Sequence, residues 1–154
     1  MATLMNFQHG ESFRERQVAE SMLRRTNPLT VRIKGGFSLL DLKRFAASQG
    51  YRGSGYLNLR FEHLASLQPA IVPVNLGDFN HFVVFRGTVD DTVLVADPAF
   101  GNRTISRTDF KKGWLGRIAF VVRRRDGIEP PNALGIEPVD LVRVPAQTIR
   151  QALR

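Results

Sequence analysis

The chain of 154 residues contains no cysteine. A disulfide bond, a thiolate metal site and a cysteine nucleophile are therefore excluded within these residues. No run approaches the roughly 20 apolar residues that a helix needs to cross a bilayer. The first residues, MATLMNFQHGE, also lack the cationic end and the long apolar stretch of a signal peptide. We therefore expect neither a membrane span nor a signal sequence within this chain.

Apolar residues, by contrast, are plentiful. They make up 43% of the chain and include 11 Phe, which is enough apolar area for a packed core and argues against disorder. The length excludes two full domains. The net charge of +8 raises the question of a nucleic-acid partner. Because the cations are scattered, without an aromatic-interleaved stripe, we expect a solvated basic surface and no nucleic-acid partner.

Helical patterns come first and strand patterns second. Ser12 with Glu15 predicts a capping box for a helix that ends near Arg25, and Ser38 with Asp41 predicts a second one that ends at Gly50. Further along we predict a short strand over 51–57, a short helix over 59–67 capped by Asn58, strands over 70–75, 81–86 and 92–97, a helix capped by Ser106 or Thr108 that runs through Trp114, and a last strand over 117–123. This order predicts an α+β fold with an antiparallel sheet.

The end of the chain differs in composition. Residues 126–154 are rich in proline, and Gly-Ile-Glu-Pro occurs at 127–130 and again at 135–138. This recurrence, eight residues apart, is too short for a repeat fold. We therefore predict one domain over residues 1–125 and a C-terminal tail over 126–154 with one closing helical turn.

The three histidines are not equivalent. His9 lies in a polar stretch and His63 in a short helix, so we predict both as surface residues rather than ligands. His81 opens an apolar strand, and Asp97 ends the next strand at a turn that contains proline. An imidazole held by a carboxylate is suited to act as a general base, because the carboxylate orients the ring and stabilises the imidazolium.

Whether His81 and Asp97 meet depends on the register of the hairpin. A connecting loop of five residues, 87–91, would place the two residues opposite one another. A two-residue turn at Asp90 and Asp91 would instead pair Asp97 with Val84, on the other face of the pleat. From the spacing alone both remain open, and the simpler interpretation is a strand-end histidine and a turn aspartate.

Several motifs, taken in order, carry a resemblance. They are GFSLLDLK at 36–43 followed by GY at 50–51, QPAIVPV at 68–74, HFVV at 81–84, VADPAFG at 95–101, and the segment 110–114. Over about residues 2 to 124 the chain resembles the papain-like peptidases that remove double-glycine leader peptides from bacteriocins. The resemblance implies a papain-like fold with N-terminal helices packed on the antiparallel sheet. It also implies that His81 and Asp97 are catalytic, with a cysteine as the nucleophile and no cofactor.

The chain departs from this family at its start. The family's cysteine opens a buried helix, and residues 2–7 resemble the remainder of that helix, so the chain begins about half a dozen residues too late. The family's oxyanion glutamine lies upstream of the cysteine, and Gln8 cannot replace it because it follows this stretch. We therefore expect the chain as written to be inactive. Truncation of a working cysteine peptidase is the favoured explanation, and a degenerate domain that binds without cleaving is the alternative.

The resemblance also suggests partners and a location. The chain is most similar to the stand-alone branch, whose members are exported to the periplasm and accompany secretion of adhesins or functional amyloid. We therefore expect an extended peptide or a secreted protein as the substrate. The alternative is a non-catalytic module that binds a leader peptide or a secretion partner. A shortened first helix would also uncover apolar surface, so we expect self-association.

Overall fold

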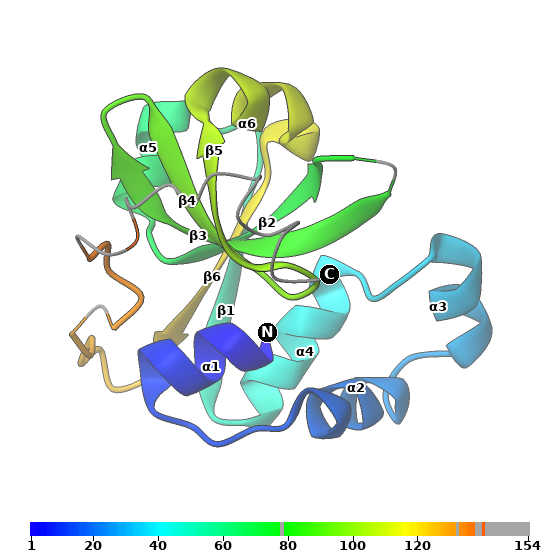
Figure 1. Ribbon diagram of the computed structural model, residues 1–154. Helices are drawn as coiled ribbons and strands as arrows, with labels where there is room; N and C mark the ends of the chain where they lie inside the picture. The colour runs from blue at the N-terminus through cyan, green and yellow to red at the C-terminus, as the bar shows by residue number, and fades with distance from the viewer. Residues whose placement is uncertain (78, 132, 138–139, 141–154) are drawn as a thin grey trace, which may run out of the picture.

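A six-stranded antiparallel sheet forms the centre of the computed structural model, which describes residues 1–77, 79–131, 133–137 and 140 (Figure 1). The spatial order of the strands is β1-β6-β2-β3-β4-β5. The strands are β1 (Tyr51–Tyr56), β2 (Ala70–Asn75), β3 (Asn80–Val89), β4 (Thr92–Asp97), β5 (Gly101–Ser106) and β6 (Ala119–Arg124). Together with the helices before and between them, this sheet confirms the predicted α+β class.

The helices cover both faces of the sheet. They are α1 (Ala2–His9), α2 (Glu15–Leu23), α3 (Pro28–Lys34), α4 (Leu39–Ser48), α5 (Phe61–Ser66), α6 (Arg107–Gly113) and a 3-10 turn, η1 (Leu115–Arg117). Figure 1 shows α1, α2 and α4 on one side of the sheet, α5 and α6 on the other, and α3 projecting at one edge. The helix expected over residues 2–7 is therefore present as α1.

Helix starts were predicted with mixed success. Ser38 caps α4, since its hydroxyl accepts a hydrogen bond from the amide of Asp41 at 3.3 Å, as predicted. The Ser12 capping box is wrong: α2 begins at Glu15, and the Gln17 side chain accepts from the Arg14 amide at 2.9 Å. Ser106, the first of the two expected caps, accepts a hydrogen bond from the Asp109 amide and starts α6.

Three local features differ from the sequence-based expectation. The Asn58 cap is wrong, because Asn58 has φ 52° and α5 starts only at Phe61. Helix α3 was not predicted, although the Asn27 side chain caps it and Pro28 occupies its first turn, both common helix starts. Strand β5 was also missed, because an edge strand pairs through its backbone and needs no buried apolar face.

Two hydrophobic cores lie on the two faces of the sheet. The helix-side core joins α1, α2 and α4 to the sheet through Leu4, Met5, Val18, Met22, Leu42, Phe45, Ala46, Tyr51, Ile71, Val84, Ala96, Phe120, Val122 and Leu134. The aromatic core joins α5 and α6 to the opposite face through Leu59, Phe61, Leu64, Ala70, Val72, Val74, Val83, Phe85, Val93, Val95, Phe110, Trp114, Ala119 and Val121. The alternation of side chains along each strand sorts neighbouring residues between the two cores.

Part of the segment expected as a tail packs on the domain. Leu134 is only 5% exposed and belongs to the helix-side core. Asp140 forms an ion pair with Arg86 at 2.8 Å. Residues 132, 138–139 and 141–154 of the expected tail lie outside the described residues.

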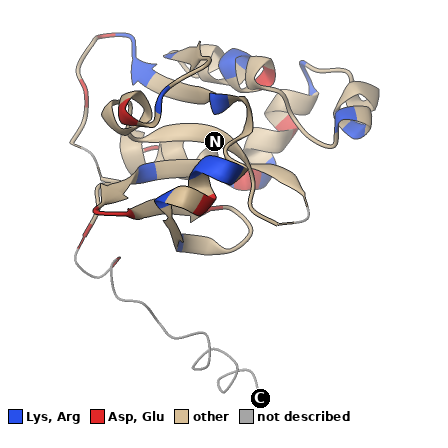
Figure 2. Cartoon of the chain, turned by 90° about the horizontal axis from the view of Figure 1, so that it is seen from above, with Lys and Arg blue, Asp and Glu red and all other residues tan. Residues whose placement is uncertain are grey.

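The charged residues are distributed over the surface. Figure 2 shows Lys and Arg on many elements with Asp and Glu among them, as expected from the scattered cations. In the part of the chain that the structure describes, no helix has both the length and the apolar character required to cross a membrane.

Candidate active site

The hairpin of β3 and β4 decides where His81 and Asp97 lie. Near the turn, Val89 is opposite Thr92, so the strands are joined by the two-residue turn at Asp90 and Asp91. The register then shifts by one between Phe85 and Gly87, which leaves Arg86 as the extra residue of a β-bulge. The five-residue loop that would have aligned His81 with Asp97 is therefore wrong.

The bulge nevertheless brings the two residues to the same face. Beyond it Phe85 is opposite Val95, so extending the register places Asp97 opposite Val83 rather than Val84. Because side chains alternate, His81 shares the face of Val83 and lies diagonally across from Asp97. The two-residue turn alone would have separated them, and one inserted residue reverses that outcome.

Contacts at Gly87 and at Arg86 stabilise the bulge. Gly87 has φ 153°, a conformation that favours glycine, and a Cβ there would collide with the Gln68 side chain and lie 2.9 Å from Ile136 Cδ1. The Arg86 guanidinium donates from Nη1 and Nη2 to the two carboxylate oxygens of Asp140 and from Nε to the Leu134 carbonyl. Leu134, Gly135 and Asp140 are therefore bonded to the bulged residue itself.

His81 and Asp97 form the contact that the resemblance implied. Nε2 of His81 lies 3.0 Å from Oδ2 of Asp97, whose side chain is fully buried. The amide of Ala99 donates to the other oxygen, Oδ1, at 2.9 Å. The turn after β4 thus orients the carboxylate, and the carboxylate orients the imidazole. The predicted contact is confirmed, while the catalytic roles of the two residues remain predictions.

A further residue, Arg103 of β5, was not identified from the sequence. Its Nη1 lies 3.3 Å from Oδ2 of Asp97, and its guanidinium stacks on the Phe100 ring at 5.1 Å. Burial opposes the ionisation of Asp97, but the hydrogen bonds from His81 and the Ala99 amide, together with Arg103, outweigh it and lower the pKa of the carboxyl. Because β5 itself was not predicted, no pattern placed Arg103 beside this site.

The contact also assigns the proton on the imidazole. An ionised carboxylate only accepts hydrogen bonds, so Nε2 of His81 must carry the hydrogen that it donates to Asp97. In the neutral ring the lone pair then lies on Nδ1, which is buried and has no hydrogen-bond partner among the described residues. His81 therefore presents a basic nitrogen that no other described group uses.

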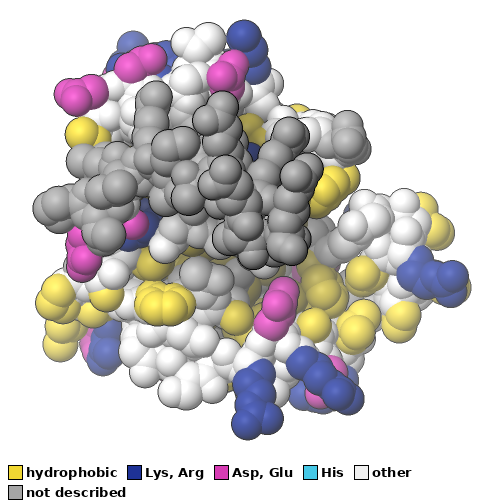
Figure 3. Space-filling model, in the orientation of Figure 1, with side chains coloured by type: hydrophobic (Ala, Val, Ile, Leu, Met, Phe, Trp, Pro, Cys, Tyr) yellow, Lys and Arg dark blue, Asp and Glu magenta, His cyan; other side chains and the backbone are white. Residues whose placement is uncertain are grey.

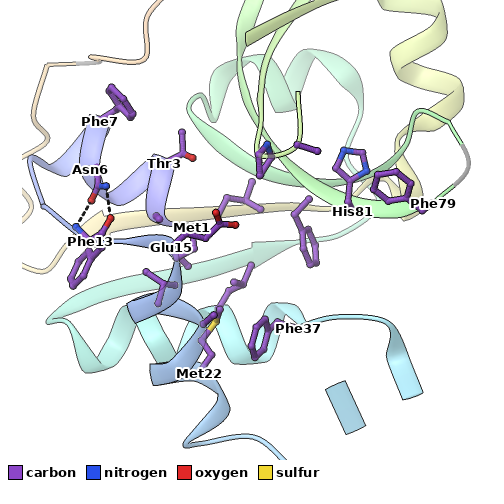
Figure 4. Close-up of a pocket in the computed structure, with 18 residues that line it drawn as sticks. Met1, Thr3, Asn6, Phe7, Phe13, Glu15, Met22, Phe37, Phe79 and His81 are labelled. Carbon is purple, nitrogen blue, oxygen red and sulfur yellow. Dashed lines mark hydrogen bonds between the residues drawn. The ribbon is translucent and has the colours of Figure 1, made fainter. Parts of the chain in front are cut away.

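An apolar cavity of about 520 Å³ adjoins His81. Its walls come mainly from α1, α2, α4, the strands β2 and β3 and the turn after β4. Figure 4 shows Met1 and Thr3 of the N-terminal segment on one side and His81 with Phe79 on the other. The Phe79 and His81 rings lie 4.9 Å apart between centroids. A cavity of this size, with largely apolar walls and His81 in its lining, can hold part of an extended peptide.

The other two histidines lie apart from this site. His63 is exposed on α5, as predicted. His9 is only partly exposed: its ring lies 4.8 Å from the Tyr51 ring, and its Nε2 lies 3.2 Å from the Val122 carbonyl oxygen, so the surface prediction holds only in part. Burial lowers the pKa of His9. Among the described residues no group of three or more His, Asp or Glu could hold a metal ion.

Comparison with known proteins gives a consistent result. Residues 15–126 match the peptidase C39 family. The chain is 37% identical over 142 residues to the probable functional amyloid protease FapD of Pseudomonas aeruginosa, and 36% identical over 141 residues to the FapD of Pseudomonas fluorescens. Each match covers 92% of this chain but only 61% of the relative, so the chain spans less than two thirds of their length.

Solved structures share the fold. The peptidase domain of Streptococcus ComA, a bifunctional ABC transporter involved in a quorum-sensing pathway, matches 80% of this chain and 87% of its own with a TM-score of 0.64 and 20% identity. A double-glycine motif protease from an AMS/PCAT transporter, solved with its leader peptide, matches 74% of this chain and 84% of its own with a TM-score of 0.52 and 26% identity. The architecture is therefore that of double-glycine peptidase domains.

Proposed function

This chain belongs to the peptidase C39 family, and on that premise we propose that it forms the general-base side of a leader-processing cysteine peptidase. The observation that carries the proposal is the hydrogen bond between His81 Nε2 and Asp97 Oδ2, which leaves Nδ1 without a partner among the described residues in a side chain that lines the cavity. His81 is the general base, and Asp97 is the carboxylate that orients it. Asp97 is ionised at neutral pH, because its pKa lies below the ordinary value.

The proposed reaction needs a thiol that these 154 residues do not contain. Nδ1 of His81 takes the proton of the thiol, and the thiolate attacks the peptide carbonyl. The imidazolium, stabilised by Asp97, returns the proton to the leaving amine as the acyl intermediate forms. Water then hydrolyses this thioester with His81 again as the base. The 154-residue chain alone is therefore catalytically inactive, since His81 cannot form the acyl intermediate by itself.

We propose an extended peptide segment of a secreted protein as the substrate. The largely apolar cavity next to His81 supports this, because it can accept apolar side chains of a peptide that lies across the site. The relatives support it as well: one is named a functional amyloid protease, and another was solved with a leader peptide. Such a substrate is exported, so the periplasm is the location that we propose.

The test separates chemistry from binding. The 154-residue chain should neither cleave a peptide that spans a double-glycine junction nor react with a thiol-directed inhibitor. A longer chain that includes the residues encoded upstream of Met1 should gain both properties if those residues supply the cysteine. In that longer chain His81→Gln should abolish cleavage, whereas His63→Gln should leave it unchanged. Cleavage by the 154-residue chain would contradict the mechanism.

A second candidate function is binding without cleavage. The cavity favours it, because its apolar walls need no thiol to hold a peptide. Isothermal titration of the 154-residue chain with a leader peptide tests this directly. If an upstream-extended chain binds the leader peptide but never cleaves it, the binding module is the better description. The two outcomes therefore distinguish an enzyme from a peptide-binding domain.

A further inference from the structure

A second cavity, of about 230 Å³, lies between α3 and α4, away from His81. Three of the side chains that line it are cationic: Arg25, Lys34 and Arg44. Hydroxyl groups of Thr26, Thr30 and Ser38 also line it. We call this cavity the basic cleft. The hydroxyls of Thr26 and Ser38 already donate to Asp41, so the cationic side chains are the groups that can bind a phosphate.

The three cations of the basic cleft are exposed. In the part of the chain that the structure describes, none of their side chains takes part in an ion pair or a hydrogen bond, unlike the arginines at positions 86, 103, 107, 123 and 124. The lining contains one carboxylate, Asp41, which is 6% exposed and accepts hydrogen bonds from Thr26 and Ser38. Burial opposes the ionisation of Asp41, but these hydrogen bonds and the charge of Arg44 outweigh it and lower the pKa, so Asp41 stays ionised. The three cations outnumber this single carboxylate, and the cleft retains an excess of positive charge.

The helix beside the cleft exposes an apolar face. No residue of α3 is buried, and Leu29 and Ile33, one helical turn apart, are 63% and 85% exposed. Leu40, at the start of α4, also lines the cleft and is 53% exposed. Figure 3 shows hydrophobic side chains next to Lys and Arg at this edge of the molecule, where α3 projects. Exposed aliphatic side chains of this kind are solvated unfavourably by water, and they can be buried in a lipid interface.

We propose that the basic cleft and the exposed face of α3 dock on an anionic phospholipid surface. The cleft takes the phosphate of a headgroup, and Leu29, Ile33 and Leu40 enter the boundary between headgroups and acyl chains. Free phosphate would explain the cations but not the adjacent aliphatic residues. A phospholipid surface matches both parts.

The experiment is flotation of the 154-residue chain with vesicles. We expect binding to vesicles that contain phosphatidylglycerol, weak binding to pure phosphatidylcholine, and loss of binding as salt increases. The triple variant Arg25→Gln, Lys34→Gln, Arg44→Gln should bind about 100-fold more weakly, since each cation near an anionic surface contributes roughly a factor of five. The matched control Arg60→Gln, Lys111→Gln, Lys112→Gln removes the same charge beside α5 and α6 and should stay within about twofold of the parent.

A second pair of measurements tests the apolar contribution. The variant Leu29→Ser, Ile33→Ser should lose most vesicle binding yet keep any affinity for glycerol phosphate in solution. All substituted side chains are exposed, so unchanged circular dichroism and melting would show that the fold is intact. Absence of binding to phosphatidylglycerol vesicles would overturn the proposal. It would also be overturned by equal losses in the two triple variants, or by vesicle binding that is insensitive to Leu29 and Ile33.

Discussion

The two faces of the sheet are packed differently. On the α5 and α6 face, the rings of Phe61, Phe85, Phe110 and Trp114 lie in mutual contact with centroids 5.8 to 6.3 Å apart. On the α1 and α2 face, residues of the helix-side core such as Val18 and Met22 also line the 520 Å³ cavity. One face therefore provides stability through dense packing, while the other leaves room for a ligand.

Core substitutions should make this difference measurable and have the largest effect. Phe110→Ala removes a fully buried ring from the aromatic core and should lower the free energy of unfolding by about 3–5 kcal/mol. Met22→Ala, at the cavity wall, should cost only about 2 kcal/mol, because its side chain has fewer neighbours to lose. Urea denaturation measures both, and equal costs would mean that the two faces are packed alike.

The next largest effect is expected from a substitution at the bulge in β3. Arg86→Met leaves Asp140 without its partner and should lower the free energy of unfolding by about 3 kcal/mol, since the pair is nearly buried. It should also shift the NMR resonances of the His81 ring, because the bulge sets the register of His81 and Asp97. Arg124→Met breaks an exposed pair with Asp126 and should change neither quantity. Unchanged His81 resonances in the Arg86 variant would show that the bulge holds without this anchor.

Acid should remove the contribution of Asp97 to the stability of the fold. The pKa of Asp97 in the folded protein lies below its ordinary value of 3.8, so its contribution to stability is complete above that value. The contribution is lost as the pH falls through 3.8 towards the lower folded value. Asp97→Asn should therefore be less stable than the parent by about 2 kcal/mol at pH 7, and the difference should shrink below pH 4. A difference that is constant from pH 7 to pH 2.5 would contradict an ionised Asp97.

Self-association through the cavity face is the smallest expected effect. Phe7 and Phe79 line the cavity and are 61% and 51% exposed. We therefore expect light scattering to show concentration-dependent association, which Phe79→Ser should reduce. Ile128→Ser removes a comparably exposed side chain elsewhere and should leave the association unchanged. A strict monomer at high concentration would contradict the expectation.

Much of the fold was predictable where local chemistry is strong. The bounds of β2 and β4 agree with the apolar runs at 70–75 and 92–97, and the Ser38 capping box starts α4 where expected. Prediction failed where the local signal is weak. Strand β5 is mostly polar and α3 buries no residue, so neither shows the periodicity that sequence analysis relies on.

The sequence by itself determined the fold class, the family resemblance and the two residues of the candidate site, His81 and Asp97. Alternation within strands and caps at helix ends are local, so they can be recognised without coordinates. Only the tertiary structure decided how these residues meet, because the two-residue turn would have placed them on opposite faces and the bulge at Arg86 reverses that. It also placed Arg103 beside Asp97 and bonded Leu134 and Asp140 to the bulge. Such contacts depend on register and on partners distant in the chain, which no local pattern specifies.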